Sequence, residues 1–126
     1  MRNKDIPDNI LTVNFFKSES GNEPVREWLK SLNQDCRKAI GEDIKTVQFG
    51  WPIGMPVVRK LDTGLWEIRS NIKDGIARII FTVIDHSIIL LHSFIKKSDK
   101  TPQDDLDTAK NRKKNLLQKV NHEIKK

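Results

Sequence analysis

Tyrosine is absent from this sequence, cysteine occurs once, and no apolar run approaches the length that a membrane-spanning helix needs. Because a single cysteine cannot form an internal disulfide, Cys36 gives no indication of an oxidising compartment. Its helical apolar surroundings are typical of a small buried residue. The N-terminal stretch MRNKDIPDNILTV lacks the continuous apolar core of a signal peptide. We therefore expect a cytoplasmic protein that makes no contact with membranes.

Clusters of histidine, cysteine and carboxylate at metal-ligand spacing are also missing, so the sequence predicts neither a metal nor another cofactor. Positive charge is what it has in excess, with 23 lysines and arginines against 17 aspartates and glutamates. Of these, ten basic and five acidic residues lie between Lys96 and Lys126, so this segment carries +5 of the net +6. One interpretation is a solvated helix face, and the other is a surface for an anionic partner, nucleic acid first.

The 126 residues are expected to form one domain, 1–126, with 1–9 as a flexible lead-in. Apolar patterns bounded by turn residues predict strands at 10–16, 57–61, 65–71, 76–84 and 87–95. Helical spacing predicts helices at 24–32 and 34–50, and a third that begins near Thr101-Pro102 and frays at 115–126. Short links between the last three strands require antiparallel hairpins. The predicted class is α+β: an N-terminal strand and a two-helix hairpin packed on a small antiparallel sheet, followed by a C-terminal helix.

Side-chain alternation along these strands separates the charged residues from an apolar face. Glu67 and Arg69 share one face of their strand, and Arg78 shares a face with Ile80. The opposite face of the strand 76–84 is wholly apolar and is expected to receive the two-helix hairpin. The cationic face is expected to stay exposed. In the last strand, alternation puts His92 on the same face as Leu90 and Phe94. The alternative for the two arginines is salt bridging to Glu67 or Asp74.

Four segments resemble the RelE/HigB toxin superfamily, in particular its phage-derived HigB-like branch. They are LWEIR, the strand 76–81, LLHSFIKKSDKTP and the helical stretch 105–112, and together the resemblance covers residues 61–112. It implies a small microbial-RNase type of fold. It also implies the toxin of a type II toxin–antitoxin system, an endoribonuclease that cleaves mRNA in the ribosomal A site. The implied partner is a helix-turn-helix antitoxin, and operator DNA would be contacted only through the antitoxin complex.

The resemblance also implies which residues surround the scissile phosphate. The cations at the matching positions are Arg69, Arg78, Lys96 and Lys97, and His92 matches a histidine that is common in this branch. Glu67 and Lys100 complete the predicted set as substrate-binding residues. Many relatives use a tyrosine as base or stacking platform, and this sequence has none. His92, Phe94 or a tryptophan would have to take that place.

Metal-independent cleavage of RNA uses the neighbouring 2′-hydroxyl as nucleophile and needs a base, an acid and cations that stabilise the phosphorane. Arginine forks suit phosphate oxygens, so we assign Arg78 to the non-bridging oxygens, with Arg69 in support. An imidazole or a lysine moves the proton. On this assignment Arg78→Ala abolishes toxicity and leaves the fold intact. Two alternatives are a non-enzymatic, gyrase-inhibiting toxin on the same fold and a degenerate protein that only binds RNA and antitoxin.

Overall fold

The structure is a computed structural model that describes residues 10–98 and 100–124, so the predicted lead-in 1–9 lies outside the described residues. In chain order, its elements are β1 (Thr12–Phe15), α1 (Pro24–Ser31), α2 (Gln34–Gly50), β2 (Val58–Asp62), β3 (Leu65–Ile72), β4 (Gly75–Ile84), β5 (Ser87–Lys96) and α3 (Gln103–Ile124). The predicted α+β class is confirmed. None of the helices in the described part of the chain combines the length and apolar character that crossing a membrane requires.

The five strands form one sheet in the order β1-β5-β4-β3-β2. Neighbouring strands are antiparallel except for β1, which pairs with β5 in parallel, so the sheet is mixed rather than purely antiparallel. The two-residue turn between β4 and β5 places Asp85 in the left-handed region at φ 54, a conformation that aspartate tolerates. This topology makes β4 and β5 central, with β3 beside them.

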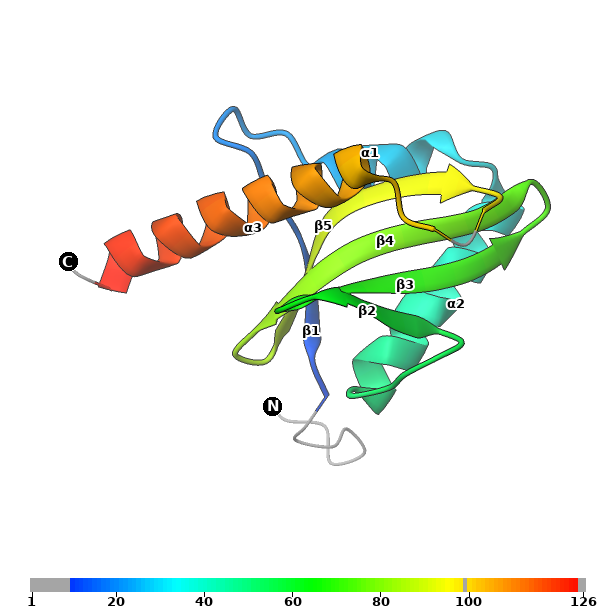
Figure 1. The fold of residues 1–126 in the computed structure, drawn as a ribbon, viewed down its shortest axis with the longest axis horizontal. Coiled ribbons are helices and arrows are strands. Elements are labelled where there is room, and N and C mark those ends of the chain that lie inside the picture. The colour runs from blue at the N-terminus through cyan, green and yellow to red at the C-terminus, as the bar shows by residue number, and fades with distance from the viewer. Residues whose placement is uncertain (1–9, 99, 125–126) are drawn as a thin grey trace.

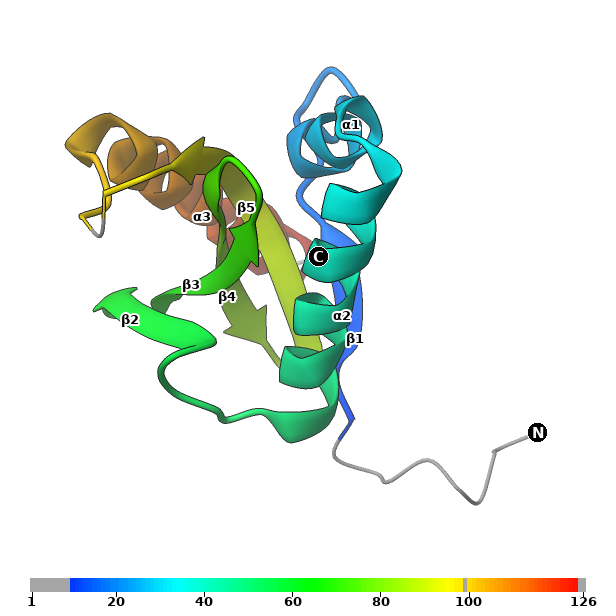
Figure 2. The same cartoon turned by 90° about the vertical axis from the view of Figure 1, so that its right-hand side faces the viewer.

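Helices α1 and α2 cover one face of the sheet and α3 lies across the other (Figures 1 and 2). Pro24 begins α1, and Asn33 caps α2 by accepting a hydrogen bond from the backbone N–H of Cys36 at 2.9 Å. Their apolar residues pack on the face of β4 that carries Ile79 and Phe81, as predicted. Burial of these apolar side chains is the main stabilising contribution to this half of the molecule.

The second face is also covered, which corrects the expectation that it stays exposed. Leu65, Ile80 and Leu91 are buried there against Ala109 of α3. At the end of β2, the Lys110 ammonium lies 3.0 Å from the Asp62 carboxylate and holds the pKa of that carboxyl below its usual value. The part of this face that carries Leu65, Ile80 and Leu91 therefore lies beneath the C-terminal helix.

A β-bulge in β5 decides which side chains of that strand face α3. In the register, Phe81 pairs with Leu90 while its neighbour Ile80 pairs with His92, so Leu91 is the extra residue. The bulge turns Leu90 into the core under α1 and α2 and leaves His92 on the α3 side. The prediction that Leu90 and His92 share a face was wrong, because strict alternation does not hold across a bulge.

Candidate functional site

A buried carboxylate on β3 holds two arginines together. The Glu67 side chain is fully buried; its Oε1 accepts a hydrogen bond from Nη1 of Arg69 at 3.2 Å and lies 3.5 Å from Nε of Arg78. Its Oε2 accepts a hydrogen bond from the hydroxyl of Thr101 at 2.6 Å. Arg69 and Arg78 are directly opposite each other in the β3–β4 register. Because like charges opposite each other destabilise a sheet, Glu67 is the counter-charge that makes this pair stable. We call these four residues the Glu67 cluster.

Arg78 lies in the interior of the protein. Its side chain has no exposed surface, its guanidinium donates a hydrogen bond to the backbone carbonyl of Ser98, and the group lies over the Phe94 ring at 5.8 Å. The expectation of an exposed Arg78 was therefore wrong, because the chain between β5 and α3 packs over this residue. In this arrangement Arg78 positions Glu67 and the backbone at Ser98.

The remaining predicted cations lie nearer to solvent. Lys96 pairs with Ile76 in the register and so belongs to the face of β4 that carries Arg78. Lys96, Lys97 and Lys100 are exposed, whereas the Arg69 side chain keeps 10% of its surface exposed. The structure thus joins Arg69 and Arg78 through one carboxylate and places exposed ammonium groups at and just beyond the end of β5.

His92 makes a second cluster, which ties β5 to α3. Its Nε2 lies 2.6 Å from Oδ1 of Asp105, and its Nδ1 lies 3.3 Å from Nη1 of Arg112. The same Nη1 donates to the carbonyl of Leu91 at 2.8 Å. Because a guanidinium only donates, Nδ1 must accept, so Nε2 carries the proton and donates to Asp105. Phe94 stacks on the imidazole at 5.8 Å, and the Arg78 guanidinium lies 5.8 Å from the centroid of the same ring. His92, Asp105 and Arg112 form the His92 cluster.

Sequence reasoning left several of these partners outside the site. Asp105 and Arg112 are seven residues apart, a spacing that places both on one face of a helix with Ala109. Burial lowers the pKa of the Arg112 guanidinium from its usual value. Arg59 on β2 pairs with Glu67 in the register and so lies on the same face. The helical spacing of Asp105 and Arg112 could have indicated from the sequence that their side chains lie together. The position of Arg59 on the face of Glu67 follows only from the strand register.

The Thr101–Glu67 contact gives a direct test of how firmly the chain before α3 is attached. We expect Thr101→Val to lower the free energy of unfolding by about 1.5–3 kcal/mol, because a buried carboxylate oxygen loses its donor. Urea denaturation measures the loss. Thr101→Ser keeps the hydroxyl and should recover most of the stability. Equal stabilities of the valine and serine variants would show that this hydrogen bond contributes little.

Comparison with known protein families places these clusters inside a matched region. A family model described as "Phage derived protein Gp49-like (DUF891)" matches residues 27–114, more than two thirds of the chain. The match extends from α1 into α3 and includes every residue of the Glu67 and His92 clusters. No curated protein matches the chain.

Proposed function

Because the chain belongs to the Gp49-like family, phage-derived toxins of the RelE/HigB type associated with toxin–antitoxin systems, we propose that it is an endoribonuclease that cleaves mRNA. We place the reaction on the ribosome, in the A site, in line with the resemblance to the HigB-like branch. A helix-turn-helix antitoxin would neutralise the toxin, and the pair would contact operator DNA through the antitoxin.

The observation that carries the proposal is the concentration of cations at one end of the sheet around a buried carboxylate. Arg69 retains some exposure and is oriented by Glu67, and Lys96 extends from the same face. We assign these two cations to the non-bridging oxygens of the scissile phosphate, where charge develops in the transition state. Lys97 and Lys100 contact the flanking phosphates. Arg78 acts as a positioning residue, because Glu67 and the Ser98 carbonyl engage its guanidinium.

His92 is the group proposed to move the proton. The 2′-hydroxyl must lose a proton and the 5′-oxygen must gain one, and an imidazole can do either near neutral pH. Asp105 and Arg112 fix the neutral tautomer of His92 before substrate binds. Substrate must displace one of these two contacts to reach a ring nitrogen. Since the chain has no tyrosine, Phe94 beside the imidazole is the proposed stacking surface for a base.

The alternative function is a toxin of the same family that acts by binding alone, on gyrase or on RNA. Two observations favour it: Arg78 is buried, and both ring nitrogens of His92 are engaged within the protein. A binding-only toxin would not depend on a proton-transferring group. The two functions differ in what fails first in the cell, translation or DNA integrity.

We expect induced expression to stop incorporation of labelled amino acid before any DNA breakage, with new 5′ ends appearing within coding sequences. Lys96→Gln/Lys97→Gln should reduce cleavage of ribosome-bound message by about 10²-fold, because phosphate contacts are lost. A matched control, Lys38→Gln/Lys45→Gln, removes two exposed charges from α2 and should cleave normally. DNA breaks that precede the translation arrest would instead support the gyrase alternative.

A further inference from the structure

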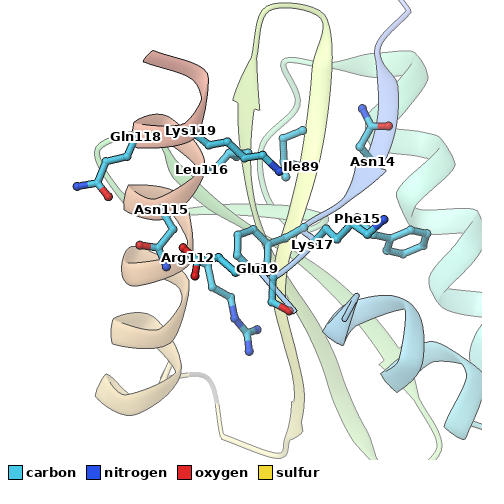
Figure 3. Close-up of a pocket in the computed structure, with 12 residues that line it drawn as sticks. Asn14, Phe15, Lys17, Glu19, Ile89, Arg112, Asn115, Leu116, Gln118 and Lys119 are labelled. Carbon is cyan, nitrogen blue, oxygen red and sulfur yellow. The ribbon is translucent and has the colours of Figure 1, made fainter. Parts of the chain in front are cut away.

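A groove of about 830 Å³ runs between α3, β5, β1 and the chain that follows β1 (Figure 3). It lies on the α3 side of the sheet, away from Glu67. The residues that give it its chemistry are Phe16, Ile89, Leu116, Lys17, Arg112 and Lys119. Figure 3 shows the Lys119 side chain extending from α3 toward Ile89 on β5. We call this cavity the α3 groove.

The α3 groove combines an apolar wall with cations and amides. Ile89 and Leu116 are half-buried against the core formed by Ile80, Leu91 and Ala109, so each still offers apolar surface. Asn14, Asn115 and Gln118 add groups that can hydrogen-bond to a peptide backbone. Leucine or isoleucine side chains fit the apolar wall, and carboxylates fit the cations. The matching ligand is an acidic peptide segment with apolar side chains.

RNA fits this groove less well than it fits the end of β5. Glu19 is a carboxylate among the lining cations Lys17, Arg112 and Lys119, and it opposes phosphates and carboxylates alike, so charge does not choose between RNA and an acidic peptide. The apolar wall does, because it would be buried against a charged sugar-phosphate backbone without gain. By contrast, Lys96, Lys97 and Lys100 are exposed around the Glu67 cluster. The apolar wall thus separates a peptide surface from the proposed phosphate surface.

We propose that the α3 groove binds an acidic, apolar segment of the antitoxin, an inference that rests on the proposed function. Arg112 belongs both to the wall of the groove and to the His92 cluster. A carboxylate in the groove competes with Nδ1 of His92 for the Arg112 guanidinium. Binding of the antitoxin therefore changes the partner of the proposed proton-transfer group without covering the exposed lysines. Neutralisation acts through Arg112.

The test uses the protein encoded by the reading frame adjacent to that of this chain as the probe. Its affinity is measured by calorimetry for the wild type, for Lys17→Glu/Lys119→Glu in the groove, and for Lys38→Glu/Lys45→Glu on α2. The groove variant should bind at least about tenfold more weakly, because it places carboxylates opposite carboxylates. The α2 variant makes the same change in net charge and should bind normally. On binding to the wild type, the ¹⁵N signal of His92 Nδ1 should shift.

Growth assays separate failure of this inference from failure of the proposed function. The groove variant should remain toxic and escape rescue by the co-expressed partner. A partner that fails to bind the wild type overturns the antitoxin pairing and this inference with it. A partner that binds the groove variant as tightly as the wild type overturns the inference alone. The groove variant could instead bind the partner normally but bind oligouridine more weakly, which would assign the groove to RNA. It could also bind the partner normally but lose a dimer of this chain, which would assign the groove to self-association. Either result would overturn the inference.

Discussion

Replacing Glu67 by glutamine should lower the free energy of unfolding by about 3–5 kcal/mol, the usual penalty for leaving a buried charge without its partner. Glutamine preserves the shape of the side chain but removes the charge shared by Arg69 and Arg78. These two guanidiniums are direct neighbours across the strands, and Arg78 has no exposed surface through which water could compensate. Denaturant unfolding measures the loss.

Two controls show whether the loss comes from burial of the charges. In Glu67→Gln/Arg78→Met both buried charges are removed, so this double variant should recover part of the stability. Glu23→Gln breaks an exposed ion pair with Arg26 at 3.1 Å, and its effect should stay below about 1 kcal/mol. If Glu67→Gln lowered the free energy of unfolding as little as Glu23→Gln does, Glu67 would not be the counter-charge that stabilises the two arginines.

The same burial changes what a variant of Arg78 can reveal about activity. The sequence-based prediction that Arg78→Ala leaves the fold intact is not supported, because the guanidinium contacts Glu67, Phe94 and the Ser98 carbonyl in the interior. Loss of toxicity in that variant would mix destabilisation with loss of chemistry. Exposed Lys96 and Lys97 are therefore the better probes of phosphate contact.

Most of the fold could be predicted because turn residues, helix starts and apolar patterns in the sequence favour the same elements that pack together in the structure. The short turns fix the hairpins β3–β4–β5, and the continuous apolar face of β4 identifies the side that receives α1 and α2. Pro24 marks the start of α1 from its preference for the first helical turn alone. These features depend on neighbours in sequence, which pattern reasoning reads well.

What could not be predicted depends on contacts between distant segments. The extra residue in β5 reverses the orientation of Leu90 relative to His92, and no local signal marks Leu91 as a bulge. Burial of Arg78 follows from the chain between β5 and α3, which packs over a face that strand alternation alone marks as polar. Glu67 was predicted as a partner of Arg69, but its bond to Thr101, 34 residues away, required the tertiary structure.

His92→Gln should reduce mRNA cleavage by about 10²- to 10⁴-fold while leaving stability almost unchanged, because glutamine can still donate to Asp105 but cannot exchange a proton near neutral pH. The substitution thus separates proton transfer from the attachment of α3 to β5. Single-turnover cleavage of ribosome-bound message measures the chemistry, and thermal unfolding measures the attachment. The limb of the pH–rate profile that reports imidazole should also disappear in this variant.

Asp105→Asn is the matched control, since an asparagine oxygen can still accept the Nε2 proton of His92 without carrying charge. Asp105→Asn should lower the cleavage rate less than His92→Gln does. It should shift the pH–rate profile along the pH axis but keep the limb that reports the imidazole, as expected for a group that acts through His92. Wild-type cleavage by His92→Gln would instead show that this histidine only fastens α3 to the sheet. The proposed nuclease would then need another residue to move the proton.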